Sequence, residues 1–304
     1  MTAVASHHKI DTLAIIGVGL IGGSFALALK KAGVVERVLG VGRREATLQK
    51  ALSLGLIDEV ATPAQAAANA DLIMIAAPVG AFEKIFADLA PTLNPKAILT
   101  DGGSTKGNVV EAAKTALGSK INQFVPGHPI AGSHEMGPEA ARADLYKNKQ
   151  VVVCPLPENA PADVAMVKTA WQNCGAQLIE MPVNQHDAVL AAVSHLPHWL
   201  ASLYVTHVSR DNNADLNLQV AGAGFGDFSR IAQGSEEMWR DIFAANREAM
   251  LEQINDLHGL LDRAKSALKE NDMDWIESML REGATVRRRW GQTPRLSGNP
   301  DDSL

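Results

Sequence analysis

The chain has 304 residues, of which 46% are hydrophobic and 20% are charged, as in ordinary globular proteins. This length suffices for two domains, and the net charge of -6 argues against a general nucleic-acid-binding protein. Two cysteines without metal-ligand spacing, no secretory signal and no run of about 18 apolar residues lead us to expect a reduced cytoplasmic protein with no membrane partner.

The first part of the chain, to about residue 181, alternates short apolar runs with helical segments. The runs read TLAII, RVLGVG, DLIMIAAP, AILTDGG, QFVPGHP, KQVVVCP and AQLIEMP. Several are apolar throughout, which is typical of parallel strands covered on both faces. The alternation predicts an α/β Rossmann-type dinucleotide-binding domain with a doubly wound parallel sheet over residues 1–182.

Three glycines follow the first run. Gly17, Gly19 and Gly22 form G-x-G-x-x-G between an expected strand at 13–16 and an expected helix at 24–31. In this setting the glycines permit a tight turn, close approach of a pyrophosphate and helix–strand packing, while the helix N-terminus attracts the phosphates. A glycine turn that binds no ligand is the alternative.

The tip of the second run indicates which dinucleotide binds. VLGVGRRE places Gly42, Arg43 and Arg44 where an NAD-specific site would carry a carboxylate for the ribose hydroxyl. A guanidinium there can hold a 2′-phosphate through two hydrogen bonds, so NADP is favoured. Solvated arginines and use of NAD are the alternative.

Two further strand ends face the same predicted crevice, because ligands bind outside the carboxyl ends of parallel strands. DLIMIAAPVG and LTDGGSTKG bring Ala-Pro, Asp, Ser and Thr there, although a helix cap would explain the Ser or the Thr equally well. The residues expected to contact the cofactor are Gly17, Gly19, Leu20, Ile21, Gly22, Arg43, Arg44, Ala77, Pro78 and Asp101.

His128 is the leading candidate for the chemistry. The stretch VPGHPIAGSHEMG holds it between a glycine and a proline at another strand end. A histidine constrained in this way can change protonation near neutral pH, which suits a general base. A structural, hydrogen-bonded histidine is the alternative.

The second part of the chain is predicted to be helical. Met250, Ile254, Leu257 and Leu261 form one apolar stripe at helical spacing. We expect an all-α domain over 183–292, a flexible tail at 293–304, and a homodimer assembled through the helical domain, whose apolar faces exceed what a small bundle can bury.

Two histidines and an arginine stand out in this helical part. SHLPHWLA places His195 and His198 on neighbouring faces of one helix, but no third ligand is evident and we expect no metal. Arg230 follows a glycine-rich stretch and is either paired internally or available to an anionic ligand.

Taken together, GVGLIGGS, DGGSTKG, GHPIAGS, SHLPH and FSRIA…MWRDI resemble the prephenate/arogenate (cyclohexadienyl) dehydrogenase family of tyrosine biosynthesis, in the family's order, over residues 13–242. The resemblance implies a Rossmann-type domain joined to a helical dimerisation domain. It also implies oxidative decarboxylation of prephenate or arogenate to 4-hydroxyphenylpyruvate or tyrosine, with hydride transfer to NAD(P).

The resemblance also implies roles for individual residues. His128 acts on the 4-hydroxyl of the substrate, and Ser104 supports that histidine and the hydroxyl. Arg230 binds a substrate carboxylate, and His198 lines the substrate pocket. We also expect its neighbour His195 to bind the substrate.

One departure from the family pattern follows GHPIAGS. His134 and then Glu135 stand where related chains often carry the acid at the first of the two positions, so their role stays open.

Two rival functions remain at this point. A 3-hydroxyacid dehydrogenase of the 6-phosphogluconate type also joins a Rossmann domain to helices, but VNQHDAVLAAVSHLPHWLA lacks the catalytic lysine of those enzymes. An NADP-sensing module without enzymatic activity is the second rival, and hydride transfer on addition of prephenate would separate it from an enzyme.

Overall fold

A computed structural model describes residues 9–132 and 135–292, which fall into two compact units. The first unit consists of the described residues up to Asp187 together with Glu236–Ala245. The second consists of Ala188–Ser235 and the described residues from Asn246 onward. The tail expected at 293–304, and His134, lie outside the described residues.

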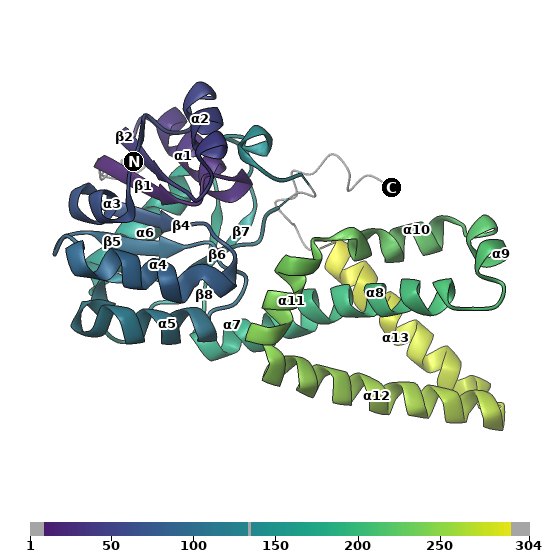
Figure 1. Cartoon of the computed structure of the whole chain (residues 1–304). Helices are drawn as coiled ribbons and strands as arrows, with labels where there is room; N and C mark the ends of the chain where they lie inside the picture. Colours follow the sequence, from purple (N-terminus) through teal and green to yellow (C-terminus); the bar gives the residue numbers. More distant parts are fainter. Residues whose placement is uncertain (1–8, 133–134, 293–304) are drawn as a thin grey trace. The chain divides into compact units, whose positions relative to one another are not determined.

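A five-stranded parallel sheet in the order β3-β2-β1-β4-β5 forms the centre of the first unit (Figure 1). Its strands are apolar because both faces are covered: Leu13 and Ile15 of β1 face one core, and Ala14 and Ile16 face the other. The strands are β1 (Ile10–Ile16), β2 (Val35–Val41), β3 (Glu59–Val60), β4 (Leu72–Ile75) and β5 (Ile98–Asp101).

Helices cover both faces of this sheet (Figure 1). One core is shared with α1 (Leu20–Ala32), α2 (Glu45–Ser53) and α6 (Pro161–Asn173), and the other with α3 (Pro63–Asn69), α4 (Phe82–Leu89) and α5 (Gly107–Leu117). The parallel sheet with helices on both sides confirms the predicted Rossmann-type fold.

The last three predicted strands do not extend that sheet. β6 (Gly127–Pro129), β7 (Gln150–Val153) and β8 (Gln177–Glu180) form a sheet of their own, in which β6 and β7 are antiparallel. The expectation of one parallel sheet was therefore wrong for this part. A parallel pair needs a long crossover, usually a helix, whereas the described part of the β6–β7 connection holds only the 3₁₀ turn Pro138–Ala140.

The second unit is helical, as predicted. One long helical stretch enters it from the first unit as α7 (Val183–Leu190), passes through a π-helical turn (Ala191–His195) and continues as α8 (Leu196–Ser209). The remaining elements are α9 (Ala214–Gln219), α10 (Ala223–Ser229), the 3₁₀ turn η6 (Arg230–Gln233), α12 (Arg247–Glu270) and α13 (Met273–Gln292).

The stretch Val183–Ser209 is long and apolar enough to cross a membrane by length and composition alone. That is weak evidence, because helices in the interior of soluble proteins meet the same criteria.

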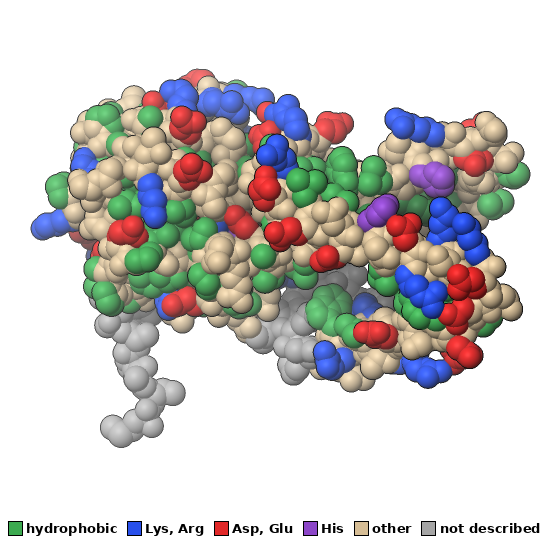
Figure 2. All heavy atoms as spheres, turned by 90° about the horizontal axis from the view of Figure 1, so that it is seen from below, with side chains coloured by type: hydrophobic (Ala, Val, Ile, Leu, Met, Phe, Trp, Pro, Cys, Tyr) green, Lys and Arg blue, Asp and Glu red, His purple; other side chains and the backbone are tan. Residues whose placement is uncertain are grey.

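On the face drawn in Figure 2, acidic and basic side chains are interspersed rather than gathered by sign.

Helix α11 (Glu236–Ala245) departs from the expected division of the chain. We expected residues 183–292 to form one helical domain, but α11 belongs to the first unit. Its Ile242 side chain is only 2% exposed and joins the core that α4 and α5 share with the sheet. Apolar burial against the first unit therefore decides where this helix packs.

Replacing Ile242 with Ala should lower the free energy of unfolding of the first unit by about 2–5 kcal/mol, because it leaves a cavity in a packed core. Glu237→Ala on the exposed side of the same helix is the matched control and should change stability by no more than about 0.5 kcal/mol. Urea unfolding followed by fluorescence measures both, and equal midpoints for the two variants would contradict this packing.

Candidate active site

The glycine loop forms a cradle at the carboxyl end of β1. Gly17 has a φ of +97°, and a Cβ there would lie 2.4 Å from the carbonyl oxygen of Ala76. A Cβ on Gly22 would lie 2.3 Å from the carbonyl oxygen of Gly17, so helix α1 approaches the strand closely only because Gly22 lacks a side chain. A Cβ on Gly19 would meet no atom within 4 Å, which leaves space for a ligand.

Helix α1 begins directly at this opening. Gly19 is its N-cap, Leu20 and Ile21 open the first turn, and no acidic residue lies in that turn. The N–H groups and the positive end of the helix dipole are therefore available to an anion without competition from a carboxylate of that turn. The cradle fits a dinucleotide pyrophosphate.

Arg43 and Arg44 follow the end of β2, and both side chains are exposed. Arg44 also serves as the N-cap residue of α2 without making a side-chain cap. Among the described residues, no ion pair is recorded for either guanidinium. Both charges are therefore available to a ligand at the strand tip.

Asp101, expected to contact the cofactor, is instead an interior residue. Its side chain and that of Lys106 are 0% exposed, and Lys106 Nζ lies 2.6 Å from Asp101 Oδ2. The backbone N–H of Gly103 donates to the same carboxylate (2.8 Å), and that of Gly127 donates to Oδ1 (2.9 Å). Asp101 therefore ties β5 to β6 and exposes no oxygen to a dinucleotide.

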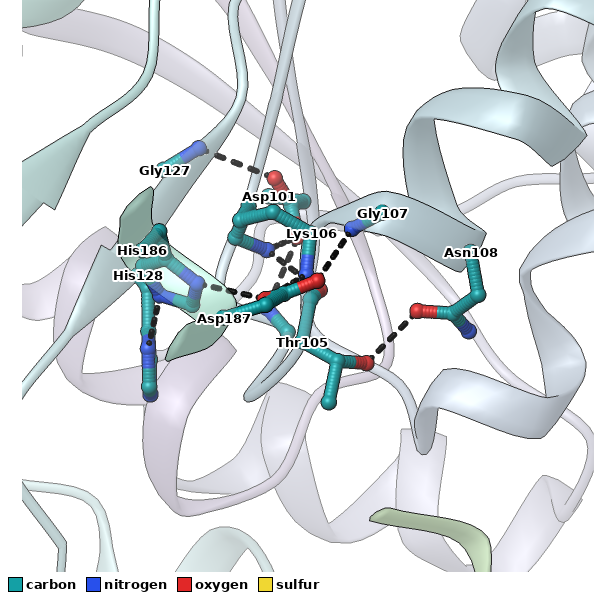
Figure 3. A network of polar contacts seen from close by, with 10 residues as sticks. Asp101, Thr105, Lys106, Gly107, Asn108, Gly127, His128, His186 and Asp187 are labelled. Carbon is teal, nitrogen blue, oxygen red and sulfur yellow. Dashed lines mark hydrogen bonds and ion pairs between the residues drawn. The ribbon is translucent and has the colours of Figure 1, made fainter. Parts of the chain in front are cut away.

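His128 lies on β6 directly after Gly127 and is 8% exposed. Its Nδ1 lies 2.8 Å from Nε2 of His186, and Nδ1 of His186 lies 2.7 Å from Oδ1 of Asp187 (Figure 3). His128 is therefore the first member of a chain of two imidazoles and a carboxylate.

His186 and Asp187 were not among the residues predicted from the sequence. They lie within α7, the helix that follows the last strand of the first unit. The available signal was the adjacent His-Asp pair in VNQHDA, just beyond a predicted strand end. The pair approaches His128 only through tertiary structure.

The start of α5 fixes Asp187. Its Oδ1 accepts a hydrogen bond from the backbone N–H of Lys106 (2.8 Å), and its Oδ2 accepts one from that of Gly107 (2.7 Å). Burial opposes ionisation, but the hydrogen bonds from His186 and from these two N–H groups outweigh it and lower the pKa of Asp187. Asp187 is therefore a carboxylate at neutral pH.

Burial also lowers the pKa of His186, although the Asp187 hydrogen bond opposes this change. His186 is therefore neutral near pH 7. His128 therefore lies next to a neutral imidazole, with an ionised carboxylate beyond it.

Ser104, Ala77 and Pro78 lie in the loops that follow β5 and β4, and none of the three is buried. Backbone hydrogen bonds connect the residues just beyond the strand ends to the last residues of neighbouring strands. The N–H of Gly17 donates to the carbonyl of Val41, that of Ala76 to Ile16, and that of Gly102 to Ile75. These loops therefore share the edge that carries the glycine cradle.

In the second unit, the SHLPH segment spans the end of the π-helical turn and the start of α8. Pro197 lacks an N–H, which interrupts the regular hydrogen-bond ladder of this stretch. His195 is 1% exposed, and its Nδ1 lies 3.0 Å from the side-chain nitrogen of Asn246 on the segment leading into α12. His198 Nδ1 lies 3.1 Å from the carbonyl oxygen of Ser194.

Arg230 is exposed at the start of η6, a turn that packs against α8. Burial lowers the pKa of His198, and the positive charge of Arg230 lowers it further against the opposing Ser194 hydrogen bond. Arg230 and His198 therefore act on each other electrostatically within this unit. Within the described residues, no group of three His, Cys, Asp or Glu side chains is placed to hold a metal ion.

Replacing Lys106 with Met should cost about 3–5 kcal/mol of stability, because it strands the buried Asp101 carboxylate. Lys114→Met is the matched control, since Lys114 forms an exposed ion pair with Glu158 at 3.6 Å and should cost at most about 1 kcal/mol. Chemical unfolding measures the difference. If the two variants were equally stable, the buried pair would not have the structural importance assigned to it here.

Comparison with known proteins gives a consistent result. The family model described as the nucleotide-binding domain of prephenate dehydrogenase matches residues 25–180, and the one described as its dimerization domain matches residues 182–282. Prephenate dehydrogenase of Bacillus subtilis (strain 168) is 35% identical over 268 residues, which cover 87% of this chain and 72% of that protein.

Solved structures resemble the chain over nearly its whole length. Prephenate dehydrogenase from A. aeolicus, in complex with hydroxyphenyl propionate and NAD+, has a TM-score of 0.86 and 33% identity, and the match covers 92% of this chain and 98% of that one. Arogenate dehydrogenase from Synechocystis has a TM-score of 0.80 and 26% identity, with 92% and 99% covered.

These matches confirm the resemblance found in the motifs and set aside the two rival functions, the 3-hydroxyacid dehydrogenase and the sensing module. The glycine cradle, the helical second unit and both family models agree along the chain. The chain belongs to the prephenate dehydrogenase family of NAD(P)-dependent oxidoreductases.

Proposed function

We propose that this enzyme oxidatively decarboxylates prephenate, arogenate or both, giving 4-hydroxyphenylpyruvate or tyrosine, with NADP as the favoured cofactor. The observation that carries the proposal is His128, a nearly buried imidazole on β6 in the same unit as the glycine cradle. The bond from Gly127 to the interior Asp101 fixes the backbone next to this histidine. A constrained imidazole suits transfer of a hydroxyl proton.

His128 moves one proton out and back in this reaction. It accepts the proton of the ring hydroxyl as hydride leaves the same carbon, and a ring ketone forms. The nicotinamide, when bound, supplies the hydride acceptor. Cleavage of the bond to the ring carboxylate then releases CO2 and sends the bonding electrons into the ring, and the phenolate oxygen takes the proton back from His128. Aromatisation drives this step.

The carboxylates of the substrate need positive partners. We assign one to Arg230, whose guanidinium is exposed and can hold a carboxylate through two parallel hydrogen bonds. His198 and His195 are assigned to substrate binding, and Ser104 to the support of His128 and the hydroxyl. The pocket must hold the departing carboxylate without stabilising the ground state more than the transition state.

The helical unit is assigned to self-association. Its described part exposes many large apolar side chains, among them Leu203, Leu216, Leu218, Val220, Leu251, Leu260, Leu261, Leu268, Leu280 and Trp290. Exposed apolar area of this kind favours burial in an interface. The match to a dimerization domain supports a homodimer, and we propose that it works in the cytoplasm without nucleic-acid or membrane partners.

Replacing His128 with Asn should leave substrate KM nearly unchanged and lower kcat by roughly 100- to 10,000-fold, because a general base is lost. Steady-state assays with prephenate and arogenate, each with NAD and NADP, test the base and identify the preferred pair together. His258→Asn, at an exposed position on α12, is the matched control. Turnover by His128→Asn close to that of the control with every pair would exclude His128 as the base.

Replacing Arg43 with Ala should weaken NADP binding by about 1.5–3 kcal/mol, the value of a hydrogen bond to a charged group, and leave NAD binding nearly unchanged. Arg37→Ala, earlier on the same strand β2 and away from its tip, should affect neither cofactor. Calorimetric titration measures the four affinities. Equal losses for NADP and NAD would show that Arg43 does not read the 2′-phosphate.

A further inference from the structure

We propose that His186 and Asp187 are positioning residues that hold His128 as the tautomer with a proton on Nδ1, so that Nε2 is the nitrogen that accepts the substrate proton. The inference extends the proposed function, in which His128 is the base. It rests on three side chains that contact one another in succession, with 2.8 Å between the imidazoles and 2.7 Å between His186 and the carboxylate (Figure 3).

Asp187 can play only one hydrogen-bonding role in this chain of contacts. Its two oxygens accept the backbone N–H groups of Lys106 and Gly107, so its orientation is set by the first residues of α5. An ionised carboxylate can only accept hydrogen bonds. The nitrogen of His186 that faces it, Nδ1, must therefore carry a proton.

The role of His186 toward His128 follows. His186 is completely buried, and a neutral imidazole has one N–H and one lone pair. With the proton on Nδ1, the lone pair is on Nε2, the atom that lies 2.8 Å from Nδ1 of His128. His128 must then donate from Nδ1, and its own lone pair is on Nε2.

The same contacts favour the next stage of the reaction. When Nε2 of His128 takes up a proton, both ring nitrogens become donors, and Nδ1 already has its acceptor in place. The negative charge of Asp187 lies one imidazole away and favours the positive ring. The arrangement is similar to a catalytic triad, in which a carboxylate orients the catalytic histidine, except that a second histidine lies between the two groups.

The tautomer can be read directly by ¹⁵N nuclear magnetic resonance of the full-length enzyme labelled on its histidine rings, because protonated and unprotonated ring nitrogens resonate far apart. Spectra of His128→Asn and His186→Gln assign the signals. We expect the proton on Nδ1 of both His128 and His186 at neutral pH. A proton on Nε2 of His128 in the unmodified enzyme would overturn the inference, whether or not the enzyme oxidises prephenate.

Two variants at position 186 test the consequence for turnover. His186→Phe fills similar space without an acceptor and should lower kcat by at least about 10-fold, but by no more than the roughly 100- to 10,000-fold loss of a general base. His186→Gln can present a carbonyl oxygen to Nδ1 and should recover part of that loss. Cofactor affinity, measured by titration, should be the same in both variants.

His258→Phe and His258→Gln on the exposed face of α12 are the matched controls and should keep full turnover. Wild-type kcat in His186→Phe, or a folded His186→Gln that is no faster than His186→Phe, would overturn the positioning role. Loss of activity in His128→Asn together with either result would leave the dehydrogenase assignment intact, so the two proposals fail separately.

Discussion

The carboxylate of Asp101 is fully excluded from water, and the placement of the site depends on how this charge is satisfied. A buried charge is tolerated only when an opposite charge and hydrogen-bond donors surround it. Lys106 supplies the charge, and the N–H groups of Gly103 and Gly127 supply donors from two different segments. The Asp101 carboxylate thereby holds together the end of the parallel sheet, the loop that follows it and strand β6.

This constraint reaches the candidate base by two routes. Along the backbone, the hydrogen bond from Gly127 to Asp101 fixes the position of His128, the next residue on β6. Through side chains, the segment that holds Lys106 presents its N–H groups to a second carboxylate, which orients the second imidazole (Figure 3). The contacts form a closed ring through Asp101, Gly127, His128, His186, Asp187 and Lys106. A closed ring resists displacement of any one member more than an open chain does, which is what preorganised catalysis requires.

Local patterns predicted the parts of this structure that depend on neighbouring residues. The glycine motif, the apolar strands and the helical second half follow from steric and periodic rules that act over a few residues, and all three are present. What failed depends on distant partners. The antiparallel β6–β7 pair depends on the connection between the two strands. The interior position of Asp101 depends on the charge of Lys106, and the sequence alone does not show that this lysine is buried.

The candidate site divides in the same way. His128 was found because it stands in a conspicuous Gly-Pro setting, whereas His186 contacts it across 58 positions of sequence and was missed. Helix α11 was expected in the helical domain and groups with the first unit. Its amphipathic pattern indicates that one face is buried but not which core receives that face.

The placement of α11 has a consequence for how the chain matures during synthesis. The ribosome delivers the residues up to Asp187 first, then the stretch Ala188–Ser235 of the second unit, and only afterwards the helix that covers the first core. Until residues 236–245 emerge, the surface that receives Ile242 stays open to solvent. The first unit therefore cannot complete its fold as the earlier-synthesised half, and both halves reach their final packing only after the chain has passed between them three times.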